Sequence, residues 1–189
     1  IPLTVLERIS SEQVPGDTNQ RLQRLCAADF MQATSGESGL EYSFRHTLIQ
    51  EFASETQLRA RRSSVDHAVA VAMEDYYRAR GDEFAALIAH HYAAAGDGLA
   101  AAKHEARAAN WLASTNASQA TKHWRRVREL LKDQSTTKEV ASLRSISGAR
   151  MVYLGWREGL RQEEIQQIVE ESLAQADQTD VDLLQLLLF

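Results

Sequence analysis

The spacing of apolar and polar residues changes near residue 45. Upstream of it, residues 30–34 and 40–44 are two short runs in which apolar and polar side chains can alternate between faces. The segment between them holds two glycines, which tolerate the positive φ angles of a hairpin loop. Downstream, Leu48, Ile49 and Phe52 recur at the three-to-four spacing of a helix. The pattern therefore predicts a β-hairpin that leads directly into a helix.

A helix is also predicted before the hairpin. Asp17 has a side chain that suits a helix N-cap, and Leu22 and Leu25 follow it at helical spacing. Helix, hairpin and helix in this order make up the wing-bearing part of a winged-helix unit, which we assign to residues 1–54. His46 falls near the junction between the hairpin and its following helix.

Residues 55–189 are predicted to form paired amphipathic helices. The first is expected between residues 55 and 80, where Gly81 supplies a C-terminal stop and Asp82 an N-cap for the second. The second helix is expected to end at the glycines on either side of Asp97. The apolar stripes of these two helices are Val65, Val69, Met73 and Tyr76, followed by Phe84, Leu87, Ile88, His91, Tyr92 and Ala95.

The helix expected over residues 99–113 is rich in alanine, which lets two helices approach closely, and Tyr92 is expected to fill the gap between them. Asn116 is the expected cap of the next helix, and Thr136 with Glu139 has the spacing of a capping box. The stripes of the later helices are Trp124, Val127, Leu130 and Leu131, then Val140, Leu143, Ile146, Met151 and Leu154, then Ile165, Ile168, Val169, Leu173 and Ala176.

Helix starts recur about every twenty residues, as in two-helix repeats. A single pair would leave part of its apolar face in water, so neighbouring pairs must stack. The expected fold is therefore all-α: a right-handed α-α superhelix of tetratricopeptide-like hairpins over residues 55–189, preceded by the partial winged-helix unit with its short β-hairpin. Because the sequence starts and stops within apolar stretches, we expect it to be part of a longer protein.

Three stretches resemble known families. Residues 44–51, which read FRHTLIQE, resemble the winged-helix segment that follows the ATPase core of STAND signalling ATPases. Residues 87–97 (LIAHHYAAAGD) resemble a tetratricopeptide unit, although His104 stands where that family usually has a large aromatic residue, which predicts a wetter or looser layer. Residues 155–176 resemble repeats of bacterial proteins that join a class III adenylate/guanylate cyclase domain to an AAA-type ATPase.

The resemblance implies a non-catalytic regulatory and protein-interaction region of a cytoplasmic signalling ATPase, coupled to cyclase output. The alternative is the sensor region of a LuxR-type STAND transcription regulator. In such families a histidine at this place can sense bound nucleotide; His46 matches it, and Arg45 adjoins it. ATP or ADP would bind the ATPase core, and no cofactor is implied for residues 1–189 themselves. His46 could equally pack or hydrogen-bond at a strand-to-helix junction.

Composition and charge disfavour several classes of function for this chain. Two prolines and nine glycines among 189 residues favour helix, and the net charge is −5. Residues 134–189 hold 5 basic and 9 acidic side chains, and nothing in the chain is basic enough to make nucleic acid a primary partner. The single cysteine, Cys26, rules out an internal disulfide framework. No apolar run is long enough to span a bilayer.

Sequence motifs of catalysis are missing from the chain. There is no G-x-x-x-x-G-K-[ST] loop, so we expect no ATP hydrolysis by these residues. There is no G-x-G-x-x-G and no G-x-S-x-G either. The six histidines lack H-x-x-x-H spacing, and we therefore predict neither a metal site nor a catalytic residue.

Several surface features have two interpretations. The arginines of residues 59–62 and 125–128 either bind acidic partners or nucleic acid, or form solvated faces that pair with Glu55 and Glu129. The large aromatics Trp111, Trp124, Trp156, Tyr76 and Tyr77 either pack in the core or grip a partner on a concave face.

The last residues predict association between copies of the chain. Residues 183–189, which begin at Leu183 and end at Phe189, read LLQLLLF and contain one polar side chain. An apolar run of this kind is expected to seek a partner surface, so the chain is expected to form a homo-oligomer through it.

Overall fold

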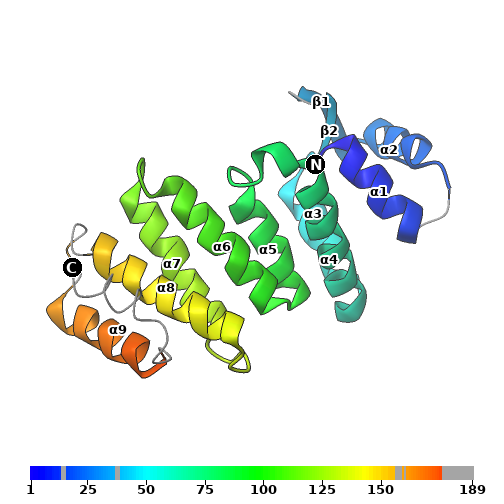
Figure 1. Cartoon of the computed structure of the whole chain (residues 1–189). Coiled ribbons are helices and arrows are strands. Elements are labelled where there is room, and N and C mark those ends of the chain that lie inside the picture. The colour runs from blue at the N-terminus through cyan, green and yellow to red at the C-terminus, as the bar shows by residue number, and fades with distance from the viewer. Residues whose placement is uncertain (14–15, 37–38, 156–158, 160, 176–189) are drawn as a thin grey trace. The chain divides into compact units, whose positions relative to one another are not determined.

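The computed structural model describes residues 1–13, 16–36, 39–155, 159 and 161–175 (Figure 1). Within these ranges there are nine α-helices, one short 3₁₀ helix and one two-stranded antiparallel sheet. Contacts group the chain into two compact units, Ile1–Arg78 and Ala79–Phe189. The predicted mostly helical chain with one short β-hairpin is confirmed. The domain boundary predicted after residue 54 stays a prediction, because contact groups do not define repeats.

The first unit begins with two helices, followed by the hairpin and two more helices. In order these are α1 (Leu3–Gln13), α2 (Thr18–Ala27), β1 (Met31–Gly36), β2 (Gly39–Phe44), α3 (Thr47–Glu55) and α4 (Arg59–Tyr76). The strands pair in a register that sets Met31 opposite Phe44 and Gly36 opposite Gly39. Asp17 caps α2 as predicted, since its side chain accepts a hydrogen bond from the Gln20 amide at 3.3 Å.

A small core holds α2 to the hairpin. Leu22, Met31 and Tyr42 are buried together, and Leu3, Leu6 and Cys26 pack against them. The chain start adds to the sheet, because the Tyr42 amide donates to the Ile1 carbonyl at 2.8 Å. Helix α4, which the sequence pattern placed in the helical array, lies against α1, and Arg8 forms an ion pair with Asp75.

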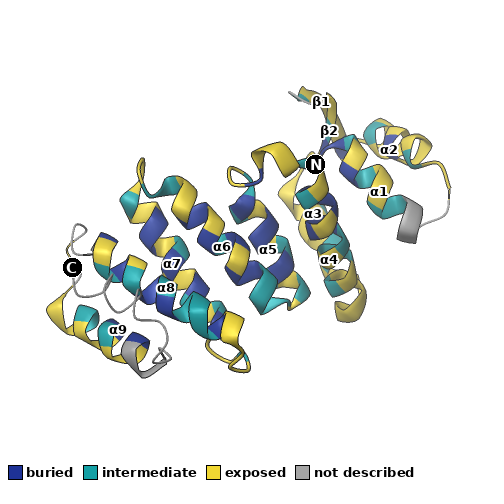
Figure 2. Ribbon diagram, in the orientation of Figure 1, coloured by how far each residue is buried: buried dark blue, intermediate teal, exposed yellow. Residues whose placement is uncertain are grey.

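The second unit is a row of helices joined by short turns. After the 3₁₀ helix η1 (Arg78–Arg80) come α5 (Ala85–Ala95), α6 (Gly98–Leu112), α7 (Ala117–Leu131), α8 (Lys138–Gly155) and α9 (Gln162–Gln175). Each of these α-helices packs chiefly on the next one in the chain. Figure 2 shows the buried residues of α5 to α8 along the sides that neighbouring helices share. Burial therefore follows the order of the sequence.

Three predicted helix boundaries are confirmed by the backbone and its caps. Gly96 ends α5 in the left-handed conformation, with φ of 85°. Asp97 then caps α6 by accepting from the Ala100 amide at 3.0 Å. Asn116 caps α7 by accepting from the Gln119 amide at 3.0 Å. Short polar side chains at these turns satisfy amides that the helices leave open.

Two predicted caps are wrong. Asp82 does not cap α5: the N-cap is Phe84, and the Asp82 carboxylate instead accepts from Arg107 of α6 at 2.9 Å. The capping box of Thr136 and Glu139 does not form, because the Val140 amide donates to Thr137 at 3.2 Å. Glu139 pairs with Lys103 of α6 at 2.6 Å. In both cases a cation on a neighbouring helix engages the predicted capping carboxylate.

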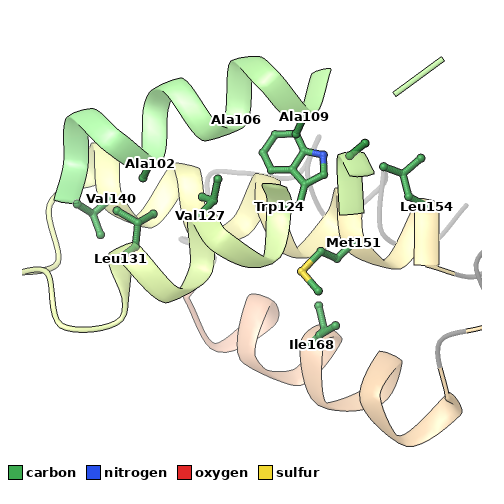
Figure 3. Close-up of a cluster of buried hydrophobic side chains, with 11 residues drawn as sticks. Ala102, Ala106, Ala109, Trp124, Val127, Leu131, Val140, Met151, Leu154 and Ile168 are labelled. Carbon is green, nitrogen blue, oxygen red and sulfur yellow. The ribbon is translucent and has the colours of Figure 1, made fainter. Parts of the chain in front are cut away.

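The core of the second unit is built around one large side chain. Trp124 is 1% exposed and lies beneath the alanines of α6, while Met151 of α8 points toward Ile168 of α9 (Figure 3). The alanines of α6 that are buried are Ala101, Ala102, Ala106, Ala108 and Ala109. Because an alanine side chain is a single methyl group, the neighbouring backbones come close and the indole fills the space that remains.

His104 is a buried part of the interface between α5 and α6. It is 5% exposed, and its ring stacks on Tyr92 with the centroids 5.5 Å apart and the planes 18° apart. The loose, wet layer expected at this position is therefore wrong. The imidazole packs as a flat ring would, in place of the large aromatic that the tetratricopeptide pattern has there.

Helices α8 and α9 approach most tightly at Gly148. A Cβ atom added there would lie 1.9 Å from Ser172 Oγ and 3.1 Å from Ser172 Cβ. Ser172 is buried, and its hydroxyl donates to the Ile168 carbonyl at 2.7 Å. The glycine is thus required by the neighbouring helix.

Replacing Gly148 by alanine tests this contact. A helix-interior glycine normally gains about 1 kcal/mol when it becomes alanine. Here we expect Gly148→Ala to lower the free energy of unfolding by about 1–2 kcal/mol, because the methyl group overlaps Ser172. Urea denaturation followed by tryptophan fluorescence measures it. The double variant Gly148→Ala/Ser172→Ala should recover most of the loss, and a stabilised single variant would contradict the close approach.

Candidate functional site

Arg45 and His46 lie between β2 and α3, as predicted. His46 is the N-cap residue of α3, with an extended backbone at φ −132° and ψ 134°, and its side chain makes no capping hydrogen bond. The side chain is exposed. The first turn of α3 contains no acidic residue. An exposed imidazole therefore stands beside the positive end of a helix dipole, where anions are favoured.

Arg45 is oriented by the residues that precede the hairpin. Its guanidinium pairs with Asp29 at 2.7 Å, and its amide donates to the Phe30 carbonyl at 3.0 Å. Asp29 has φ of 64°, and among the described residues it is the one non-glycine residue with a positive φ. The sequence analysis did not single out Asp29, because no sequence motif marks an aspartate with a positive φ. The pair ties the start of β1 to the end of β2.

The helix that follows His46 presents apolar side chains to solvent. Leu48 and Phe52 are 77% and 70% exposed, and α3 contains no buried residue. Their helical spacing was predicted correctly, but the stripe does not pack into the core of the first unit. A hollow of about 350 Å³ beside α3 is lined by polar side chains, including Thr47, Glu51 and Arg62.

The second arginine cluster is paired with acids. Arg126 pairs with Glu129 at 2.8 Å, as one interpretation predicted. Arg125 reaches Glu164 at 3.2 Å, and Arg128 reaches Glu171. Both of these acids lie on α9, about forty residues away in the chain, so their role was not visible in the sequence. In the first cluster, Arg62 donates to Ser54 at 3.4 Å, and no pair with Glu55 was found there among the described residues.

One partly buried pair links α6 to α7. His123 Nδ1 lies 2.6 Å from a carboxylate oxygen of Glu105, with side chains 22% and 13% exposed. Neither residue was singled out from the sequence. The contact joins α6 to α7.

The aromatic side chains divide between the two interpretations. Trp124 belongs to the core, whereas Trp111 is 56% exposed at the end of α6. Tyr76 and Tyr77 meet edge to face with their centroids 4.8 Å apart. Trp156 lies outside the described residues, as do residues 183–189. Trp111 is therefore a candidate contact residue on the surface, and Trp124 is not.

Across the described ranges, no group of three His, Cys, Asp or Glu side chains is placed to hold a metal ion. Every described helix falls short of the length and apolarity that crossing a membrane requires. Comparison with protein-family models, with curated proteins and with solved structures found no match to the chain.

The backbone at Asp29 gives a direct test of the Arg45 anchor. Asp29→Ala should lower the free energy of unfolding of the first unit by about 1–2 kcal/mol, since alanine resists positive φ and cannot pair with Arg45. The free energy of unfolding of Asp29→Gly should stay close to that of the parent. Glycine adopts a positive φ without strain, and this gain offsets the loss of an exposed ion pair worth at most about 1 kcal/mol. Hydrogen exchange of the β1 and β2 amides reports both. Equal losses in the two variants would show that the ion pair, not the backbone, dominates.

Proposed function

We propose that this chain is a non-catalytic regulatory and protein-interaction region of a cytoplasmic STAND signalling ATPase. In this proposal residues 55–189 belong to a right-handed superhelix of tetratricopeptide-like hairpins, and residues 1–54 are part of the winged-helix unit. The array receives a signal by binding protein, and the winged-helix unit relays it to the ATPase core. ATP or ADP binds that core and not these residues.

The packing of the second unit supports an interaction role. Helices α5 to α9 bury their apolar faces on their neighbours in sequence order, as stacked hairpins do. The buried polar side chains within the core of this unit are mostly short hydroxyls and one stacked histidine. The polar and charged side chains are left mainly on the outside, where they are suited to contact other molecules.

The exposed side chain of His46 carries the relay part of the proposal. The imidazole stands at the N-terminus of α3 without a capping hydrogen bond, next to an arginine that Asp29 holds in place. A phosphate brought to this point by an ATPase core would meet a ring nitrogen donor and the open amides of a helix end. Residues 44–51 (FRHTLIQE), which include His46, carry the resemblance to STAND ATPases.

The output of the longer protein distinguishes two versions of the proposal. Coupling to an adenylate/guanylate cyclase domain is the version we favour, because residues 155–176 resemble the repeats of cyclase-linked proteins. A LuxR-type transcription regulator is the alternative. Reading the gene outward from both ends of this coding sequence separates them: a cyclase domain upstream supports the first, and a helix-turn-helix downstream supports the second. An isolated gene without an ATPase domain would remove both.

Substituting His46 tests the relay in the full-length protein. We expect His46→Ala to weaken binding of ADP or ATP by about tenfold or more, the loss of one charge-assisted hydrogen bond. Isothermal titration with each nucleotide measures it. His90→Ala is a matched control, because His90 is an exposed helix residue of the second unit. Unchanged affinity and unchanged switching in the His46 variant would contradict the sensing role.

We also propose that copies of the chain associate through residues 183–189. The five leucines and one phenylalanine of this run favour contact with an apolar surface over water. Light scattering at increasing concentration should show particles larger than a monomer, and Leu186→Glu/Leu187→Glu should shift them to monomer. A monomer at every concentration for the unsubstituted chain would refute the association.

A further inference from the structure

A charged groove runs along one side of α7, between it and α9. The larger part is a hollow of about 470 Å³ lined by side chains from α7, Arg144 of α8 and Glu171 of α9. The smaller part, about 330 Å³, is lined by the first half of α7 and by Gly159, Arg161 and Glu164. Arg125 lines both parts, so they are neighbours along α7. We call the two together the α7–α9 groove.

The lining of the α7–α9 groove is mainly cationic. Its basic side chains are Lys122, Arg125, Arg128, Lys132, Arg144 and Arg161. The acidic side chains are Glu129, Glu164 and Glu171, so the described lining has an excess of three positive charges (six against three). The whole chain carries −5, so the groove is opposite in sign to the protein around it. A local field of this kind draws acidic groups to one place on the surface.

Three of these cations are held in position by the fold. Arg125 and Arg128 cross from α7 to Glu164 and Glu171 of α9. Arg144 donates to the Leu131 carbonyl at the end of α7, at 2.5 Å, and to the Gln134 carbonyl in the turn that follows, at 3.0 Å, and so caps that helix. Each guanidinium has five N–H donors, and the contacts with Glu164 and Glu171 use one nitrogen each of Arg125 and Arg128. Donors are therefore presented to the groove in fixed directions.

The other three cations of the groove are exposed. In the portion of the chain that the structure describes, Lys122, Lys132 and Arg161 are exposed and form no ion pair. They flank the anchored arginines along the same groove. The groove thus combines arginine donors held in fixed directions with exposed charges that a ligand can reach.

We propose that the α7–α9 groove binds an extended acidic peptide segment of a partner protein. This inference rests on the proposed interaction role of the helical array and names its site and the chemistry of its partner. In an extended chain, alternate side chains point to the same side, so glutamates at every second position can meet successive cations along α7. Bidentate pairing of carboxylate with arginine gives the contact direction as well as charge.

The composition of the groove favours carboxylates over a nucleic acid. Three glutamates interrupt the row of cations and would repel a continuous phosphate backbone. Among the described residues that line the two hollows there is no aromatic side chain, whereas single-stranded nucleic acids are bound by stacking their bases on aromatics. The acidic protein around the groove adds to the repulsion of a long polyanion.

The test uses the whole chain and a synthetic peptide that alternates glutamate with serine. Fluorescence anisotropy should show binding that weakens with added salt, and the counterpart peptide with glutamine should not bind. Lys122→Gln/Lys132→Gln should weaken binding by about tenfold, since two exposed charge contacts are lost. Neither lysine holds another helix, so the variant should keep the melting temperature of the parent. Lys138→Gln/Arg150→Gln removes two exposed charges of α8 outside the groove and should bind as the parent does.

Three results would overturn the proposal. They are no binding of the glutamate peptide at low salt, equal loss in the groove and control variants, or tighter binding of a single-stranded oligonucleotide than of the peptide at the same ionic strength. The gene-context experiment is independent of these results. If the gene encodes an ATPase domain but the chain does not bind the peptide, only the groove assignment is wrong. If the chain binds the peptide but the gene encodes no ATPase domain, the groove assignment stands and the proposed relay is wrong.

Discussion

Close packing of alanine-rich helix faces is the constraint on which the second unit depends. Five alanines of α6 are buried, and α5 adds Ala85 and Ala89 to the same kind of contact. Methyl groups supply little apolar area individually, so the stability must come from bringing backbones close and filling the space between them with a few large side chains. Trp124, with Val127 and Leu131 on the same helix, fills that space. A larger residue at Ala102, Ala106 or Ala109 would separate α6 from α7, which Trp124 now joins.

The position of α9 shows which interactions hold the row of helices together. Two ion pairs connect α7 to α9, but exposed pairs are worth at most about 1 kcal/mol each. Ile168 is 5% exposed, and burying a side chain of its size contributes about 1.5–3 kcal/mol. The close contact of Gly148 with Ser172 adds packing that no surface charge can replace. Packing therefore fixes α9, and the ion pairs fix the direction of the arginines.

The sequence predicted what depends on neighbours along the chain. Helix periodicity, the hairpin, the caps at Asp17 and Asn116 and the helix end at Gly96 are all local, and each was found where the pattern set it. The predictions that depended on distant residues did less well. Asp82 and Glu139 have the chemistry of N-terminal capping or first-turn residues, but Arg107 and Lys103 engage them from α6.

The candidate sites divide in the same way. The position of His46 at a strand-to-helix junction could be predicted, because it follows from a change of period. The roles of Asp29 beside Arg45, of the acids of α9 and of the lysines of the groove could not be predicted. They depend on chain segments that are far apart in the sequence and that folding brings together. The exposure of Leu48 and Phe52 could not be predicted from the pattern either. An amphipathic stripe indicates that a helix face can be buried, but it does not identify the surface that would cover it.

One arrangement recurs at both candidate surfaces. An arginine is held by a carboxylate from another element: Arg45 by Asp29, and Arg125 by Glu164. A single carboxylate can accept from two of the five donors of a guanidinium in its best geometry, so an anchored arginine still has donors to offer. An anchored side chain also has less rotamer entropy to lose when a second acid arrives, which lowers the cost of binding. Both surfaces present oriented positive charge, which attracts acidic groups, and this is the physical basis of the binding role that we propose.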